Sequence, residues 1–230
     1  MLASRPLPPP SLAIIIPTLD EEAQLAAMLP ALSEHAEEIV VSDGGSRDGT
    51  RELAACHGAR VVEGSPGRGV QLRRGVTAAR GDVLLFLHAD TRLPGEAFER
   101  IRAAVGRGAA AGGFTVLFDP PTPLLRIGSH LVNLRTRLTR LPLGDQGQWA
   151  TRAAYEAVGG FRDWPILEDL DFMRRVKRYG PVTILSGPAR TSSRRFRQLG
   201  FARTVATNWL IWTLYAVGVS PHKLARLYRR

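Results

Sequence analysis

The chain has 230 residues, of which 44% are hydrophobic and 23% are charged, with 23 glycines and 16 prolines. This composition is typical of one globular domain and excludes a disordered, collagen-like or disulfide-rich protein. The net charge of +10 is uneven, because no Asp or Glu follows Asp171 whereas 13 of the 31 Lys and Arg residues do. The surplus of positive charge therefore belongs to the C-terminal end of the chain.

The N-terminal segment and the single cysteine limit the cellular compartment. Residues 1–10 contain an arginine and a proline run where a signal peptide needs an unbroken apolar stretch, so we expect a flexible tail. Cys56 has no disulfide partner, which favours a reducing compartment, and its helical-looking surroundings predict a buried structural thiol. We therefore expect a cytoplasmic protein.

Apolar runs alternate with helical segments through the first part of the chain. The expected strands are Leu12–Ile16, Glu38–Val41, Ala59–Val62 and Val83–Leu87, and the expected helices between them are Glu21–Ser33, Gly49–His57 and Gly67–Arg80. This alternation predicts right-handed crossovers and an α/β fold, with a Rossmann-like, mostly parallel central sheet flanked by helices. Sheets of this kind bind ligands at the carboxyl ends of their strands.

Each expected strand ends in a polar sequence: PTLDEE, SDGGSRDGT, EGSPGRG and HADT. Neither the dinucleotide fingerprint nor the P-loop motif is present among them. In SDGGSRDGT the two glycines allow a sharp turn, Ser46 or Asp48 stands where a helix N-cap belongs, and Asp43 alone is best explained as a turn residue. Since parallel strands end at one edge, we expect these exits to form a shared polar pocket.

The HADT sequence places His88 and Asp90 directly after an expected strand. A carboxylate at such a position is a hard oxygen ligand that suits Mg²⁺ or Mn²⁺, ions that also contact substrate phosphates. Asp90 is therefore a candidate metal ligand. His88 is a candidate second ligand, although a structural role is favoured, and the alternative for Asp90 is an N-cap of the helix expected near Pro94.

Five motifs, in this order, resemble the family 2 glycosyltransferases: IIIPTLDEE, VVSDGGSRDGT, ARGDVLLFLHADT, YEAVGGF and LEDLDF. The resemblance covers roughly Leu12 to Gly180 and implies the GT-A fold and an inverting sugar transfer. It implies a transferase domain over 11–190, with a nucleotide-binding half (11–91) and an acceptor and catalytic half (92–190). The charge and aromatic pattern of 191–230 predicts a basic amphipathic helical extension after it. GDQG at 144–147 and the ending LYAVGVSPHKLARLYRR are similar to the selenium-domain-associated subgroup, which is linked to arsenosugar biosynthesis.

The resemblance also implies roles for individual donor-side residues. It implies the first nucleotide-contacting loop at Pro17, Thr18 and Glu21, the aspartate that contacts base and ribose at Asp43, a basic residue near the nucleotide at Arg68, and the D-x-D metal motif at His88, Ala89 and Asp90. This chain has His in place of the first Asp of that motif. It also has Arg73 where the family tends to have Asn, so a contact made by an amide would be changed or lost.

Asp169, in LEDLDF, matches the catalytic base of the family. A nucleotide diphosphate leaves readily when a divalent metal covers its charge, so that the metal replaces a general acid and one base remains to be supplied. A well-placed base contributes ~10²–10⁴-fold to the rate. The alternative is that Glu168, Asp169 and Asp171 are first-turn acids favoured by the helix dipole.

The acceptor side is expected to include Glu168, Gln146, Trp149, Arg194 and Arg195. Trp149 could offer a flat face to a sugar or an apolar acceptor, although an aromatic residue here is more often part of the core. The arginines could reach phosphate or an anionic acceptor, and a solvated or membrane-facing cluster explains them equally well.

The C-terminal segment from Phe201 to Ser220 is apolar but contains Arg203. Its charge-free part, about 16 residues, is shorter than the ~20 residues that a membrane-spanning helix needs. Aromatic residues recur every three positions between the basic clusters RRFR and KLARLYRR, which fits a helix lying in an anionic membrane surface. A helix packed on the domain or paired with a second copy is equally compatible. No nucleic-acid-binding motif is present, so we expect no nucleic-acid partner.

Together these patterns predict a cytoplasmic transferase at the inner face of a membrane that uses a nucleotide-sugar donor, UDP-linked, a divalent metal (Mn or Mg) and an unknown acceptor. Sugar nucleotidyltransferases open with a glycine-rich loop after the first strand, which PTLDEE lacks. The alternative is a nucleotide-binding protein of the same fold that acts at a membrane surface with little or no turnover. Metal-dependent product formation separates the two.

Overall fold

Strands and helices alternate through the chain, of which the computed structural model describes residues 8–228. The strands are β1 (Leu12–Thr18), β2 (Glu38–Asp43), β3 (Arg60–Glu63), β4 (Val83–Phe86), β5 (Thr91–Arg92), β6 (Ala111–Asp119), β7 (Gln148–Thr151) and β8 (Val182–Ser192). The helices are α1 (Glu22–Ser33), α2 (Thr50–Cys56), α3 (Arg68–Ala78), α4 (Ala97–Gly106), α5 (Pro123–Thr139), η1 (Gly144–Gln146, 3-10), α6 (Arg152–Ala157), α7 (Glu168–Tyr179), α8 (Arg194–Leu199), α9 (Phe201–Ala216) and α10 (Pro221–Tyr228). The strands and helices expected before His88 are all present, with small shifts at their ends.

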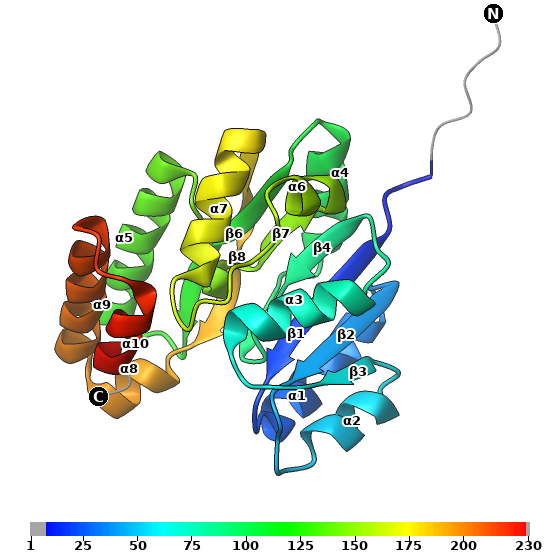
Figure 1. The fold of residues 1–230 in the computed structure, drawn as a ribbon, viewed down its shortest axis with the longest axis horizontal. Helices are drawn as coiled ribbons and strands as arrows, with labels where there is room; N and C mark the ends of the chain where they lie inside the picture. The colour runs from blue at the N-terminus through cyan, green and yellow to red at the C-terminus, as the bar shows by residue number, and fades with distance from the viewer. Residues whose placement is uncertain (1–7, 229–230) are drawn as a thin grey trace, which may run out of the picture.

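The strands form one sheet in the order β3-β2-β1-β4-β7-β6-β8-β5 (Figure 1). The first four of these are parallel neighbours, as the sequence predicts. Thr18 of β1 is paired with Asp43 of β2, and Asp43 is paired with Glu63 of β3. Because the strand ends are in register, their polar exits come together at one edge of the sheet.

The second half of the sheet is mixed. Strand β7 runs antiparallel to both β4 and β6 and so joins the two halves, while β6 and β8 are parallel to each other. The β6–β8 register shifts between Phe114 and Thr115, a bulge of the kind that increases local twist. The α/β fold with a mostly parallel centre is confirmed, and the antiparallel strands are confined to the half where the sequence pattern loosens.

Apolar side chains cover both faces of the sheet. Along β1, Leu12, Ile14 and Ile16 pack with α1, α2 and α4, whereas Ala13 and Ile15 pack with α3, α6 and α7. Figure 1 shows α3, α6 and α7 in front of the sheet. Successive strand residues point to opposite faces, so a strand buried on both faces is apolar at every position.

Helices α8, α9 and α10 follow β8 and lie beside α5 at one side of the sheet (Figure 1). The guanidinium of Arg135 in α5 lies 5.2 Å from the ring centroid of Trp212 in α9. A Cβ at Gly128 of α5 would lie 3.6 Å from the Phe201 ring. The C-terminal helices expected from the sequence are therefore present and packed, and within residues 8–228 none of the helices has the length and hydropathy needed to cross a membrane.

Three local expectations are wrong. Cys56 is exposed, because it lies on the outer side of the last turn of α2. The residue before α2 is Gly49, so neither Ser46 nor Asp48 is its N-cap. Helix α4 follows Glu96, which leaves Asp90 free of the capping role. The flexible tail expected over 1–10 falls mostly outside the described residues.

Candidate active site

Asp43 is a fully buried carboxylate at the end of β2. Its Oδ1 accepts hydrogen bonds of 2.8 Å from the backbone N–H groups of Gly45 and Ser46, and its Oδ2 accepts from the hydroxyls of Thr18 and Ser46. Burial raises the pKa of Asp43, but these hydrogen bonds outweigh it and hold the pKa below its usual value. Asp43 therefore fixes a negative charge and the turn that follows β2.

Two residues of α3, missed from the sequence, tie β1 and β2 together at this edge. The Gln71 amide nitrogen donates to the carbonyls of Thr18 and Ser42, at 2.7 and 2.9 Å. The Arg74 guanidinium donates to the Asp43 carbonyl at 2.6 Å and to the Ser42 hydroxyl at 3.2 Å. Arg73, by contrast, is exposed. The i, i+3 spacing in QLRRG is the signal that could have placed Gln71 and Arg74 on one helix face.

Glu21, just before α1, lies near Arg194 at the start of α8. The Arg194 Nη2 atom is 3.4 Å from the Glu21 carboxylate. Burial raises the pKa of Glu21, the positive charge of Arg194 opposes it, and the negative charge of Asp90 adds to it. Glu21, Asp90 and Arg194, predicted separately, therefore belong to one cluster. Pro17 and Thr18 form the strand end beside it.

His88, Ala89 and Asp90 follow β4 into this cluster. Burial and the charge of Arg68 lower the pKa of His88 to about 3, so its imidazole is neutral at physiological pH. Burial raises the pKa of Asp90, against the lowering effect of Arg194 and Arg68. Ala89 is buried between them.

The donor set fits a divalent cation that is completed by a substrate. No group of three or more His, Cys, Asp or Glu side chains arranged to hold a metal occurs within residues 8–228. Ions such as Mg²⁺ use one or two protein carboxylates together with substrate phosphates, and Asp90 with neutral His88 meets that pattern.

Asp169 lies in the first turn of α7, opposite His88. Its Oδ2 accepts a 2.8 Å hydrogen bond from the backbone N–H of Gly144. A Cβ at Gly144 would lie 2.6 Å from Nε2 of His88 and 3.4 Å from Oδ2 of Asp169, so this glycine separates the two side chains. The absence of a side chain at Gly144 lets the His88 ring pack against its backbone.

Glu168 is completely buried beside Asp169, and no described residue donates a hydrogen bond to either of its carboxyl oxygens. The nearest positive group is Nη1 of Arg68, at 3.5 Å. Burial raises the pKa of Glu168 to about 7, although Arg68 opposes this and Asp169 adds to it. Glu168 is thus a carboxyl group close to its protonation point at physiological pH.

Arg68 is the positive centre of the site. About half of its side chain (49%) is exposed to solvent, and the protein atoms around its guanidinium lower its pKa. The charges of Glu168, Asp169, Asp90 and Asp145 outweigh this effect and hold the pKa above its usual value. These carboxylates come from the exit of β4, from η1 and from α7. The predicted metal motif and the predicted base therefore face the same arginine.

Asp145, not singled out by the sequence motifs, belongs to the same group. Burial raises its pKa to about 6, with Arg135 opposing and Asp169 adding to the effect. Burial and Arg68 lower the pKa of Arg195 in α8, which places its positive charge near Arg68. Asp145 comes from the GDQG motif, and no local sequence pattern indicates that it is buried.

Two acceptor-side expectations are wrong. Trp149 is fully buried in β7, between β4 and β6, and offers no face to a ligand. Gln146 is also fully buried: its Oε1 accepts from Arg135, Thr136 and Leu143 at 3.0 Å each. Gln146 therefore anchors η1, the turn that carries Gly144 and Asp145.

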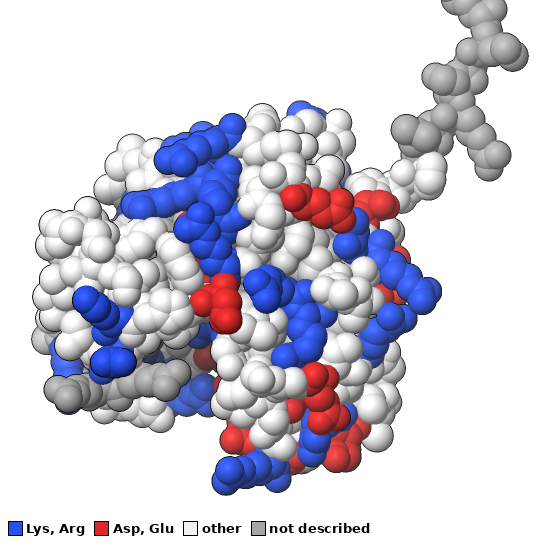
Figure 2. Space-filling model, in the orientation of Figure 1, with Lys and Arg blue, Asp and Glu red and all other residues white. Residues whose placement is uncertain are grey.

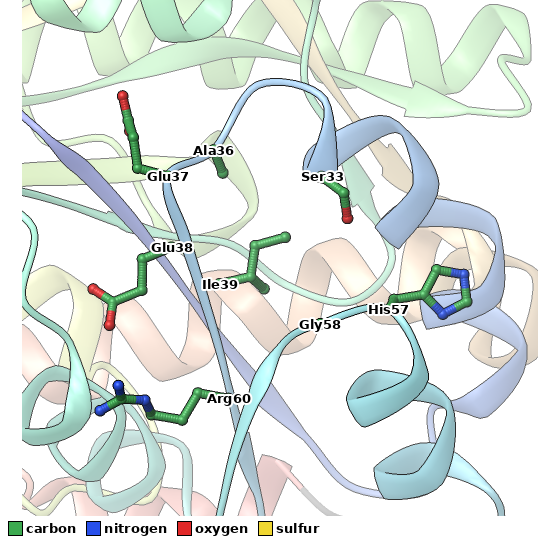
Figure 3. Close-up of a pocket in the computed structure, with 8 residues that line it drawn as sticks. All are labelled: Ser33, Ala36, Glu37, Glu38, Ile39, His57, Gly58 and Arg60. Atoms are coloured by element: carbon green, nitrogen blue, oxygen red, sulfur yellow. The ribbon is translucent and has the colours of Figure 1, made fainter.

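Asp90 also lines a cavity of about 300 Å³ between α1 and the β5–β8 edge, together with Gln24, Arg92, Asp119 and Ser192. A second cavity, about 290 Å³, lies at the other edge of the sheet, between the ends of α1 and α2 and the start of β2 (Figure 3). There Glu38 accepts hydrogen bonds from Arg80 and Gly81, and Arg60 donates to the Ala78 carbonyl. The second cavity is therefore remote from the cluster, and these side chains serve the fold.

The residues from 13 to 190 match the glycosyl transferase family 2, and the chain belongs to that family. Its fold is that of the GT-A glycosyltransferase structures. TarS of S. aureus in complex with UDP superimposes with a TM-score of 0.64 at 15% identity, over 79% of this chain and 60% of that one. Glucosyl-3-phosphoglycerate synthase of Mycobacterium tuberculosis with Mn²⁺, UDP and phosphoglyceric acid gives 0.63 at 18% identity, over 91% and 79%.

Among curated relatives, a glycosyltransferase of Mycobacterium tuberculosis is 34% identical over 140 residues, which are 59% of this chain and 64% of the relative. Glucosyl-3-phosphoglycerate synthase of Mycolicibacterium paratuberculosis is 32% identical over 93 residues, 35% of this chain and 28% of the relative. The chain thus spans less than two thirds of the length of either relative. The resemblance to the selenium-domain-associated subgroup stays a prediction.

Proposed function

We propose that this chain is an inverting glycosyltransferase that moves a sugar from a UDP-linked donor to an acceptor hydroxyl, with divalent metal and with Asp169 as general base. The observation that carries the proposal is the position of Arg68 among Asp90, Asp145, Glu168 and Asp169. The carboxylates of the metal motif and of the proposed base thus both act on one positive charge. A shared positive charge between them suits a reaction in which a diphosphate leaves a sugar while a hydroxyl attacks it.

On the donor side, the turn held by Asp43 and the loop after β1 would bind the nucleoside. Arg68 and Arg194 would contact the diphosphate as positive charges near Asp90. A bound divalent cation, held by Asp90 and His88, would neutralise the charge of the departing diphosphate. The complexes of TarS with UDP and of the mycobacterial synthase with UDP and Mn²⁺ support this donor class.

On the acceptor side, the Asp169 carboxylate lies beside His88, with Oδ2 accepting from the backbone N–H of Gly144 and Oδ1 from that of Leu170. The acceptor oxygen forms a bond to the anomeric carbon, the bond from that carbon to the diphosphate oxygen breaks, and the acceptor proton passes to Asp169. One displacement inverts the anomeric configuration. The same proposal places the enzyme in the cytoplasm at the inner face of a membrane, which the basic C-terminal end supports.

Calorimetric binding of UDP and GDP, with and without Mn²⁺, tests the donor side in the wild type, in Asp90→Ala and in Asp119→Ala. Asp119 lines the same cavity as Asp90 but is not a proposed ligand. We expect metal-dependent binding of UDP in the wild type and the Asp119 variant, and loss of the metal dependence in Asp90→Ala. Metal-independent binding in all three proteins would contradict the metal site.

Product formation tests the transfer itself. Incubation with UDP-sugars and Mn²⁺, followed by measurement of released UDP and of the anomeric configuration of the product, should show metal-dependent release with inversion. Tight UDP binding without release from any donor, with water or with added acceptors, would instead identify a nucleotide-binding protein.

A further inference from the structure

Helix α5 carries an uncovered apolar stripe. Its members recur at alternating spacings of three and four residues and are all more than half exposed: Leu124, Ile127, Leu131, Leu134 and Leu138. Leu138 is the most exposed, at 75%. This spacing places all five side chains on one face of the helix, over a length of ~20 Å.

The other faces of α5 have partners. Leu125, Ser129 and Thr136 are buried toward the sheet, where the Ser129 hydroxyl accepts a hydrogen bond from the backbone N–H of Phe118. Gly128 and Arg135 face α9. The apolar stripe is therefore an additional face of α5, not a misplaced part of the core.

Helix α9 extends the same surface. Ile127 and Leu134 stand directly before Gly128 and Arg135, the two residues of α5 that face α9. The stripe therefore borders α9. Trp209 lies three residues before Trp212, the residue of α9 that contacts α5, and is 72% exposed. We call the stripe together with Trp209 the α5–α9 surface. A patch of large exposed apolar side chains on one side of a protein marks an interaction site.

The surroundings of this surface are basic. Helices α5, α8, α9 and α10 contain no Asp or Glu, while α5 carries exposed Arg126 and Arg137 and α10 carries Lys223 and Arg226. In Figure 2 this side of the molecule is almost entirely white and blue. An apolar stripe between basic side chains matches the boundary between the acyl chains and the headgroups of an anionic bilayer.

We propose that the α5–α9 surface docks on an anionic lipid bilayer, with the apolar stripe and Trp209 at the headgroup boundary and the arginines on lipid phosphates. The charge pattern favours lipid over a second copy of the chain. A two-fold contact through this surface would bring the basic edges of both copies together, and like charges at an interface are repulsive. The inference specifies the membrane contact of the proposed function, and vesicle binding is measured independently of sugar transfer.

Vesicle flotation of the full chain tests the proposal, with vesicles of phosphatidylcholine alone or mixed with phosphatidylglycerol. We expect binding to the mixed vesicles only, weakened by salt. Leu131→Glu/Leu138→Glu should lower the partition coefficient at least ~10-fold, because two apolar contacts become negative charges. The control Ala55→Glu/Cys56→Glu adds the same charges on exposed positions of α2 and should bind like the wild type.

A second variant removes charge without touching the stripe. Arg126→Gln/Arg137→Gln should weaken binding about fivefold per arginine. UDP affinity and thermal melting of each variant report whether the fold is intact. The proposal is overturned if the wild type fails to float with mixed vesicles or if the stripe variant floats equally well. It is also overturned if sedimentation velocity shows a wild-type dimer that the stripe variant converts to a monomer, which assigns the surface to a second copy.

Discussion

Two carboxylates of the site have no solvent-exposed area, yet their pKa values shift in opposite directions. On the donor side, Asp43 is completely buried and accepts hydrogen bonds from Thr18, Gly45 and Ser46, so its pKa is lowered. On the catalytic side, Glu168 is just as buried, has no hydrogen-bond donor among the described residues, and has a pKa raised to about 7. At Asp43 the hydrogen bonds outweigh burial and keep the acid charged, whereas at Glu168 the cost of burial dominates.

The difference in pKa between Asp43 and Glu168 indicates that the two sides of the site have different roles. The donor side satisfies its own charges within the fold, so its geometry is fixed before a ligand arrives. The catalytic side leaves Glu168 and one oxygen of Asp145 without donors among residues 8–228, so these groups can still change their protonation or their partners. A buried carboxyl without a close hydrogen-bond donor is costly, and such costs concentrate at functional sites.

The largest expected effect is on turnover. Asp169→Asn keeps the shape of the side chain but removes the proton acceptor, so the rate of sugar transfer should fall ~10²–10⁴-fold. UDP affinity should change little, because the substitution lies on the catalytic side. Single-turnover kinetics measure the rate, and calorimetry measures the UDP affinity. A loss of UDP affinity equal to the loss of rate would mean that Asp169 acts in donor binding and that the two sides are not separate.

The next effect concerns stability. Since the folded-state pKa of Glu168 is about 7 and the ordinary value is 4.5, the folded protein holds this proton more tightly than the unfolded chain. The free energy of unfolding should therefore fall as pH rises between these values, by up to about 3 kcal/mol, and level off above them. Glu168→Gln removes this decline. Urea unfolding at about pH 5 and about pH 8 compares the two proteins.

Asp145, with its pKa raised to about 6, contributes a smaller decline in both proteins and cancels in the comparison. Parallel stability curves for the wild type and Glu168→Gln would show that the pKa of Glu168 is not raised in the folded protein.

Gly144→Ala tests the packing of His88 and Asp169 on the catalytic side. The added Cβ would lie 2.6 Å from Nε2 of His88, so the ring has to move. We expect turnover to fall about tenfold, since small displacements of reacting groups are costly in rate. Gly106→Ala, where a Cβ has no neighbour within 4 Å, is the matched control and should leave turnover unchanged. Equal turnover in the two variants would mean that this space is not used.

The smallest effect is expected on the donor side. Asp43→Asn weakens charge-assisted hydrogen bonds and should lower the free energy of unfolding at neutral pH by about 1–2 kcal/mol. Because the folded-state pKa is below the ordinary 3.8, this stabilisation is present above that pH and disappears as pH falls through the folded-state value. The stability curves of the two proteins should converge in acid. A constant difference down to low pH would contradict a lowered pKa.

The donor half could be predicted from sequence because its structure is encoded locally. The run LAIII at Leu12–Ile16, the glycines after Asp43 and the alternation of strand and helix up to His88 each specify neighbouring backbone, and the parallel order follows from the crossovers. The positions of Glu21 and Asp90 follow from the strand ends. Gln71 was missed because its partners lie on two other strands.

The other half depends on contacts between distant residues. Strand β6 pairs with β8 across a bulge, and no local pattern specifies that register. The sequence favours a core position for Trp149 over a ligand-facing one, and its position between β4 and β6 settles the choice. The burial of Glu168 and Asp145 and the exposure of the α5 stripe are likewise properties of packing. The sequence identifies these residues but does not specify which side chains pack around them.

The ion pair between Arg194 and Glu21 joins residues 173 positions apart. During synthesis, the strands and helices that carry Thr18, Asp43 and Asp90 can form long before Arg194 emerges from the ribosome. Glu21 and Asp90 must spend that interval without the positive charge that α8 brings to them. A nascent chain would therefore complete this edge of the sheet last, after most of the sheet is in place.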